Sequence, residues 1–404
     1  MVVGRIGVVD THFQPILDLA SGRVVAHEAL SRFADASGPV SPDSAFEDAY
    51  RRGAVEIVDD QCISRAVVAA DGLGGRDAHE LFVNVEPPTL WRGQLPAGLT
   101  SGLPLTIEIT ERALAQDTGR LLSAIERLRE HGHAIAVDDL GAEPATLALL
   151  PLIAPDVIKL DMGLIRQRPD VHAARIMTAV ADYAGRNETV VLAEGIENER
   201  HELTARALGA TLGQGWHYGR PGSAEAAPRV VTSSAERSEW RARIARSASA
   251  ASARAATPFE IISAAVPARR ADRALLLQVS TFLEERAHSG GDSAVLLATF
   301  QHDSNVTPAT RRRYERLADS GCLLTVYTVG GASGLPVGAL NRLVDRDDRL
   351  AAEWDVIVLT ADHAAALTAR EIDAARHAEG EYDFVLTTDR ELVTHAARAL
   401  LAHR

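Results

Sequence analysis

Short apolar runs that end in an acidic, amide or lysine side chain recur along the first half of the chain, and this rhythm limits the folds open to it. In the sharpest example, residues 134–137 lead directly into Asp138 and Asp139. Comparable runs end at Glu28, Asn84, Glu108, Lys159, Glu194 and Gln214. Most successive members lie roughly 20 to 35 residues apart, and helix-like stretches such as residues 42–70 fill the intervals. This spacing predicts a parallel barrel whose strands end at one rim.

Asp138 and Asp139 are neighbours at the end of a predicted strand. Adjacent side chains of a strand point to opposite faces, so the two carboxylates can share one centre only where the backbone turns. Two carboxylates held close together repel unless a proton or a cation lies between them. The pair therefore indicates either a divalent cation site or a helix N-cap at Asp139 beside a solvated acid.

Oxygen donors predominate among the residues that end these runs. The candidate ligands are Glu28, Asn84, Glu108, Asp138 and Asp139. Hard oxygen ligands without His or Cys suit Mg²⁺ or Mn²⁺ rather than zinc. Two such cations about 3.5–4 Å apart are typical of sites that hydrolyse phosphate esters. We therefore expect a rim that binds a pair of cations.

The length, net charge and cysteine positions of the chain limit its domain number and its partners. The 404 residues predict two domains, of which one can be a barrel of about 250 residues. A formal net charge of −13 argues against a nucleic-acid polymer as partner. Cys62 and Cys322 lie too far apart in sequence to suggest a disulfide framework or a zinc cluster. No apolar run or signal-peptide pattern indicates a membrane partner, so we expect a cytoplasmic protein.

Eight short motifs occur in a fixed order between about residues 10 and 222. They are Gln14-Pro15-Ile16, Glu28-Ala29-Leu30 with Arg32, Asn84, Glu108-Ile109-Thr110-Glu111, Asp138-Asp139-Leu140-Gly141, Lys159-Leu160-Asp161, Ala193-Glu194-Gly195-Ile196-Glu197 and Gln214-Gly215. In order and spacing, this set resembles the EAL-domain cyclic-di-GMP phosphodiesterases. The resemblance implies a (β/α)₈ TIM-type barrel with an irregular first strand. It also implies hydrolysis of cyclic di-GMP to linear pGpG and a homodimer through the barrel.

The resemblance implies a role for each matching residue. The implied ligands of two Mg²⁺ or Mn²⁺ ions are Glu28, Asn84, Glu108, Asp138, Asp139 and Glu194, with Asp138 bridging. The implied catalytic residues are Lys159, Glu194 and Glu28, of which Lys159 positions the attacking water. The implied substrate contacts are Gln14, Leu30, Arg32, Asp161 and Gln214. We expect Glu111 and Glu197 to orient the site as second-layer acids rather than to bind metal.

The loop after the paired aspartates departs from the family. The family usually has an aromatic residue followed by a Gly-Thr-Gly-Tyr-Ser-type loop, which orders the metal site and couples it to dimerisation. Here Leu140 replaces the aromatic residue, and Glu143-Pro144 replaces the second glycine. Proline stiffens the loop and removes a hydrogen-bond donor. We therefore expect slow or conditional hydrolysis. The alternatives are a barrel that binds cyclic di-GMP without turnover and an enzyme for another phosphodiester.

The composition changes after residue 222. Residues 1–222 are predicted as the barrel, 223–256 as a helical linker, and 257–404 as a smaller α/β domain. The order of elements in the last segment resembles the DICT sensory domain, which implies signal input. No catalytic set is recognisable there, and the glycine-rich residues 330–334 are predicted as a loop.

Overall fold

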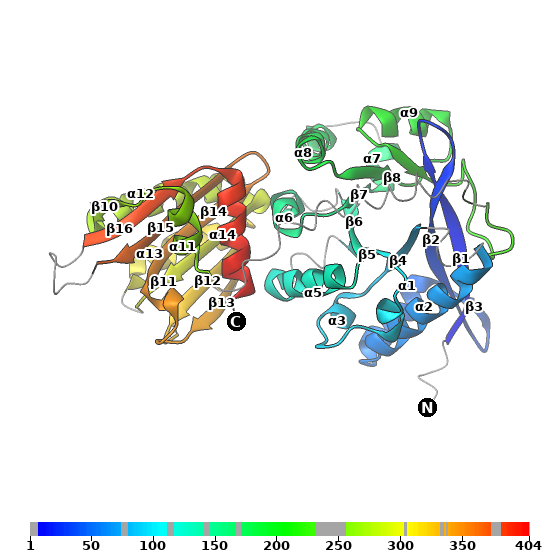
Figure 1. Ribbon diagram of the computed structural model, residues 1–404, viewed down its shortest axis with the longest axis horizontal. Helices are drawn as coiled ribbons and strands as arrows, with labels where there is room; N and C mark the ends of the chain where they lie inside the picture. Colours follow the sequence, from blue (N-terminus) through cyan, green and yellow to red (C-terminus); the bar gives the residue numbers. More distant parts are fainter. Residues whose placement is uncertain are drawn as a thin grey trace. The chain divides into compact units, whose positions relative to one another are not determined.

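The computed structural model describes residues 7–73, 80–110, 117–140, 145–166, 171–228, 230, 256–302, 305–331, 335–336, 338–372 and 381–403 (Figure 1). The chain divides into two compact units. One unit comprises Met1–Glu143 and Ala154–Ala251, and the other comprises Pro144–Ile153 and Ser252–Arg404. Within the described ranges, no helix combines the length and the apolar character that crossing a membrane requires.

The first unit is built on a closed ring of strands. Strand β1 (Gly7–Asp18) pairs antiparallel with both β2 (Val24–Asp35) and β9 (Leu212–Gln214), and these pairings close the ring. The other strands of this sheet are β3 (Gly38–Val40), β4 (Glu80–Asn84), β5 (Thr106–Thr110), β6 (Ala134–Leu140), β7 (Val157–Leu160) and β8 (Val190–Ala193). From β2 through β4 to β9 the neighbours are parallel, and β3 pairs with β2 outside the ring. The predicted barrel with an irregular first strand is confirmed.

Helices occupy the connections between these strands, as the alternating pattern predicted (Figure 1). They are α1 (Pro42–Arg51), α2 (Val55–Ala69), α3 (Pro87–Leu90), α5 (Thr118–Glu130), α6 (Ala145–Ile153), α7 (Met162–Arg166), α8 (Val171–Asn187) and α9 (Glu199–Ala207). Residues 42–70, predicted as helical, form two helices rather than one. The backbone at Gly53 takes a positive φ of 62° and separates α1 from α2. The barrel core includes Ile16, Phe82 and Leu192, which are fully buried.

Asp59 is a buried carboxyl on α2. Its residue is 1% exposed, and its Oδ2 accepts a hydrogen bond of 3.0 Å from the backbone N–H of Glu86. Burial raises the pKa of Asp59 from 3.8 to about 7, although this hydrogen bond opposes the rise. Between these two pH values the folded barrel binds a proton that the unfolded chain has already released.

The free energy of unfolding is therefore expected to fall as the pH rises from about 4 to about 7. Asparagine carries no charge and keeps an oxygen for the Glu86 N–H. Asp59→Asn should therefore raise stability at pH 8 by roughly 2 to 4 kcal/mol, and by much less at pH 4. Urea unfolding followed by tryptophan fluorescence measures both values. Glu47→Gln, an exposed change of the same charge, is the control, and an equal gain at both pH values for Asp59→Asn would contradict the expectation.

The second unit is a mixed sheet covered by helices on both faces. Its strand order is β10-β16-β15-β14-β11-β12-β13. The strands are β10 (Arg269–Asp272), β11 (Ala294–Phe300), β12 (Leu323–Val329), β13 (Ala339–Val344), β14 (Glu353–Thr360), β15 (Ala364–Glu371) and β16 (Glu381–Thr387). The helices are α11 (Pro258–Ala265), α12 (Arg273–Gly290), α13 (Pro308–Asp319) and α14 (Arg390–Ala402). Helices α12 and α13 share a core with one face, and α11 and α14 pack together on the sheet (Figure 1).

The α/β class of this unit agrees with the prediction. The sequence pattern did not predict three of its strands: β10, β13 and β15. The helix predicted within the linker falls outside the described residues, as does part of the glycine-rich stretch 330–334.

Candidate active site at the barrel mouth

Polar side chains from neighbouring strands gather at one mouth of the ring. The parallel registers place Asn84 of β4 beside Glu108 of β5, and Thr110 of β5 beside Asp138 of β6. The structure brings together Glu28, Asn84, Glu108, Asp138, Lys159, Glu194 and Gln214. Residues that are scattered over most of the barrel sequence therefore meet at one centre.

The ammonium group of Lys159 lies at the middle of this cluster. Its Nζ lies 2.5 Å from Glu108 Oε1, 2.7 Å from Glu194 Oε1, 3.0 Å from Asp138 Oδ1 and 3.8 Å from Glu28 Oε1. Burial disfavours the charge, but the surrounding carboxylates outweigh it and raise the pKa of Lys159 well above its usual value. The side chain is therefore a fixed positive charge, only 1% exposed.

Lys159 is also the only lysine in a chain with 42 basic residues of the Lys and Arg types. A compact ammonium directs its three donors to separate partners, whereas a planar guanidinium presents its donors in one plane. Carboxylates that surround the group on several sides therefore suit an ammonium better than a planar guanidinium. The presence of one lysine in an arginine-rich chain was therefore a sequence signal for a special role of Lys159, and the motif comparison did not use it.

Two side-chain amides hold the Glu28 carboxylate. Asn84 Nδ2 donates to Glu28 Oε1 over 3.0 Å, and Gln214 Nε2 donates to Glu28 Oε2 over 2.5 Å. Burial favours the neutral acid, but Lys159 and these hydrogen bonds outweigh burial and lower the pKa of Glu28. Glu28 is therefore ionised and oriented toward the centre of the mouth.

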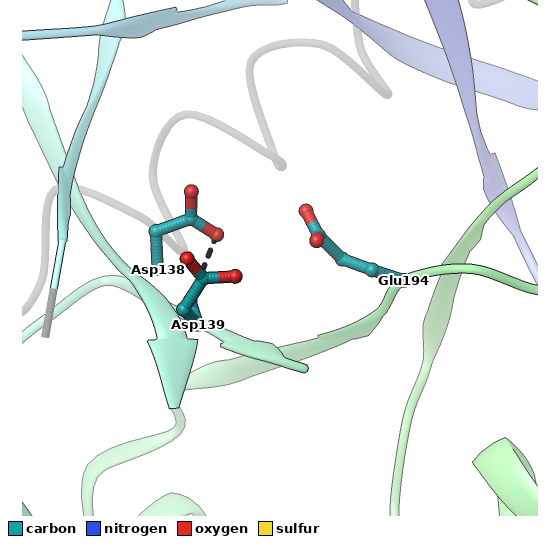
Figure 2. Close-up of side chains that lie close together, drawn as sticks. All are labelled: Asp138, Asp139 and Glu194. Carbon is teal, nitrogen blue, oxygen red and sulfur yellow. Dashed lines mark hydrogen bonds between the residues drawn. The ribbon is translucent and has the colours of Figure 1, made fainter. Parts of the chain in front are cut away.

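The backbone turns at the paired aspartates, as sharing one centre requires. Asp139 has a left-handed φ of 57°, and the register between β6 and β7 shifts between Val137 and Leu140. The Asp139 N–H donates to Asp138 Oδ1 over 3.0 Å (Figure 2). Asp139 lies inside β6, and the next helix, α6, begins at Ala145, so the N-cap alternative is wrong.

Asp138, Asp139 and Glu194 form an oxygen-donor group. One carboxylate oxygen from each lies within 4.8 Å of the others, and Figure 2 shows Glu194 directed toward the two aspartates. Burial raises the pKa of Glu194 to about 8 against the attraction of Lys159. Burial and the Asp138 charge also raise the pKa of Asp139. Burial and mutual repulsion disfavour the ionised form of these carboxyl groups, and a bound divalent cation would stabilise that form. The donor set therefore fits Mg²⁺ or Mn²⁺.

Glu108 belongs to the same acidic group. Burial and the neighbouring Glu28 charge raise its pKa well above the usual value, and Lys159 opposes the rise. Its side chain has no exposed surface in the described structure. Glu108 is therefore a further buried oxygen donor beside Lys159.

The predicted substrate contacts lie around this centre. Gln14 of β1 donates to the Gly219 carbonyl over 3.2 Å, and its own oxygen accepts from Gln214 over 3.2 Å. Arg32 follows Glu28 along β2, and its guanidinium donates to the backbone carbonyls of Leu30 and Ser31. Leu30 is half-buried. Gln14 and Arg32 therefore border the mouth on adjacent, paired strands.

Asp161 and Glu197, two further predicted residues, have hydrogen-bond or ion-pair partners beside this centre. Asp161 accepts a 2.6 Å hydrogen bond from the Gly163 N–H at the start of α7. Glu197 pairs with Arg166 over 2.9 Å and not with the metal-ligand candidates. Arg166, which sequence reasoning missed, also donates to the Gly195 carbonyl over 3.3 Å and so braces the loop after Glu194. Its position on a surface helix gave no signal in the sequence. Glu111 and the departing loop at residues 141–144 lie outside the described residues.

A closed, mostly parallel barrel with oxygen donors at its mouth defines a class of barrel proteins suited to bind divalent cations. The EAL domain model matches residues 5–221, more than half of the chain, and the chain belongs to the EAL domain family. Residues 262–372 match the DICT model, described as "Sensory domain in DIguanylate Cyclases and Two-component system". Both family resemblances seen in the sequence are confirmed.

Named relatives share the barrel part of the chain. The probable cyclic di-GMP phosphodiesterase PdeB of Escherichia coli (strain K12) is 30% identical over 220 residues, which are 52% of this chain and 42% of that protein. The cyclic di-GMP phosphodiesterase NbdA of Pseudomonas aeruginosa is 31% identical over 228 residues, or 52% of this chain and 29% of that protein. The chain thus spans less than half the length of these relatives. Among solved structures, "PaMucR Phosphodiesterase, c-di-GMP complex" has a TM-score of 0.48 at 24% identity, covering 55% of this chain and 93% of that one.

Proposed function

We propose that the barrel hydrolyses one phosphodiester bond of cyclic di-GMP to give linear pGpG, under the control of the C-terminal domain. The observation that carries this proposal is the buried group of carboxylates around Lys159 in a chain of the EAL domain family. The proposal includes a cytoplasmic location, a homodimer through the barrel, and domains at residues 1–222 and 257–404 joined by a linker at 223–256.

The chain supplies the groups for this reaction. The residues that would hold two Mg²⁺ or Mn²⁺ ions are Glu28, Asn84, Glu108, Asp138, Asp139 and Glu194. When bound, such ions acidify water and neutralise charge on phosphoryl oxygens. The permanently charged Lys159 can donate hydrogen bonds to the attacking water. The Arg32 guanidinium can donate two parallel hydrogen bonds to a phosphate of the substrate, and the Gln14 amide can donate one beside it.

Removing divalent cations tests the proposal directly. The full chain incubated with cyclic di-GMP and Mg²⁺ or Mn²⁺ should form pGpG, because the oxygen-donor group then carries the ions that the reaction needs. An excess of EDTA should lower the rate at least about 100-fold, and adding Mn²⁺ back should restore it. Chromatography of the nucleotides measures substrate and product.

Specificity and turnover need separate controls. Unlabelled cyclic di-GMP should compete with the labelled substrate, whereas linear dinucleotides and cyclic AMP should compete poorly. Binding of cyclic di-GMP without product under either metal would support the receptor alternative and overturn the proposed hydrolysis.

A further inference from the structure

A pocket of about 500 Å³, counted to its open mouth, lies in the C-terminal unit between α12, α13 and the sheet. One face of α12 forms a wall through Arg273, Leu277, Ser280 and Glu284, which are spaced three or four residues apart. Strands β11, β14 and β16 form the floor. As far as the structure is described, every lining residue belongs to this unit.

Aromatic rings line much of the pocket, from the floor strands and from Tyr314 of α13. Phe300 and Tyr314 form an edge-to-face pair with ring centroids 5.6 Å apart, and Trp354 and Tyr382 form a second pair at 5.7 Å. Such pairs hold each other in fixed orientations. The floor therefore offers a rigid apolar surface to a planar ring system.

Ser280 places an unsatisfied polar group in the wall. The residue is 3% exposed, and its Oγ has no hydrogen-bond partner among the residues that the structure describes. A buried hydroxyl without a partner costs roughly 1–3 kcal/mol. A ligand in the pocket can supply the missing partner, because Ser280 lines the pocket.

Among the residues that the structure describes, the charges at the pocket leave the Arg273 guanidinium without a carboxylate partner. The Arg313 guanidinium donates to the buried Glu284 carboxylate over 2.6 Å, so these two charges balance. Arg273 is exposed and donates instead to the neutral amide oxygen of Asn305 over 2.7 Å. Glu284 is the only acidic side chain on the described pocket wall. The pocket therefore favours a ligand with one negative charge.

We propose that this pocket binds a small planar aromatic molecule that carries one acidic group. The ring system packs against Phe300 and Trp354, the acidic group pairs with Arg273, and Ser280 hydrogen-bonds a polar substituent. This site goes beyond the proposed hydrolysis and does not depend on it, because its lining contains no residue of the described barrel.

Titration of the full chain with 8-anilinonaphthalene-1-sulfonate, a fluorescent planar aromatic anion, tests the site. We expect saturable binding with one site per chain. Arg273→Ala should weaken binding about fivefold or more because it removes the cation that pairs with the sulfonate. Arg312→Ala, an exposed change of the same charge on α13 outside the pocket, should leave binding unchanged. Absence of saturable binding would overturn the proposal.

Two further measurements make the test independent of folding defects. Ser280→Phe fills the pocket and should abolish binding. Leu277→Glu adds a negative charge at a position that is 40% exposed, so it should fold normally and weaken binding as Arg273→Ala does. Naphthalene-2-carboxylate should displace the dye at least about tenfold more effectively than neutral 2-naphthylmethanol. Unchanged binding in both Arg273→Ala and Leu277→Glu, or equal displacement by acid and alcohol, would overturn the proposal.

Discussion

Replacement of Glu28 by alanine is expected to lower the rate of pGpG formation by at least about a thousandfold. The change removes a proposed metal ligand and leaves the Asn84 and Gln214 amides without their acceptor. It also removes one of the negative charges around Lys159. The rate of product formation with saturating Mn²⁺ measures the effect, and circular dichroism checks the fold.

Two further variants serve as controls for this prediction. Glu28→Gln keeps the side-chain shape but not the charge, so a loss close to that of Glu28→Ala would assign the effect to charge. Glu199→Ala removes an exposed acid from the first turn of α9 and should retain full activity. A Glu28→Ala protein that kept a tenth of the wild-type rate would contradict the assignment.

Replacement of Lys159 by methionine is expected to destabilise the barrel by roughly 3–5 kcal/mol in EDTA. The four carboxylates around its ammonium would lose their common partner, and buried like charges repel. Divalent cations should restore much of the lost stability, because they bind the folded cluster and supply positive charge. Product formation should stay low even with metal, because the proposed donor to the attacking water is absent.

Melting temperatures with and without Mn²⁺ test this expectation. Lys159→Arg is the matched control, since it keeps the charge but replaces the ammonium with a planar guanidinium. We expect it to be more stable than Lys159→Met in EDTA and to remain inactive. If Lys159→Met melts like the wild type in EDTA, the central ammonium does not hold the acids together.

The barrel could be predicted from sequence because most of its strands are short and apolar and end in polar residues. Residues 134–137, for example, are buried in β6 and end at Asp138 on the rim. Strand β15 shows where this approach fails. Its sequence, AAALTARE, is rich in alanine, which favours helix. Pairing with β14 and β16 on either side overrides that local preference.

The candidate site was predictable in residue type but not in detailed pairing. The order of acids along the chain pointed to Glu28, Asp138 and Glu194 without showing how they meet. The sequence predicted Asp161 as a substrate contact and Glu197 as an orienting acid without showing the partners of either. The structure places Asp161 at the start of α7 and Glu197 against Arg166. These contacts depend on helix positions that no local motif encodes.

The single lysine at the centre of the barrel mouth also gives this chain a built-in spectroscopic reporter. Isotopic labelling of lysine introduces one labelled side chain, and it lies among four carboxylates. The nuclear magnetic resonance signal of that label can be assigned without mutagenesis. Its chemical shift reports on the electric field at the site of the proposed reaction.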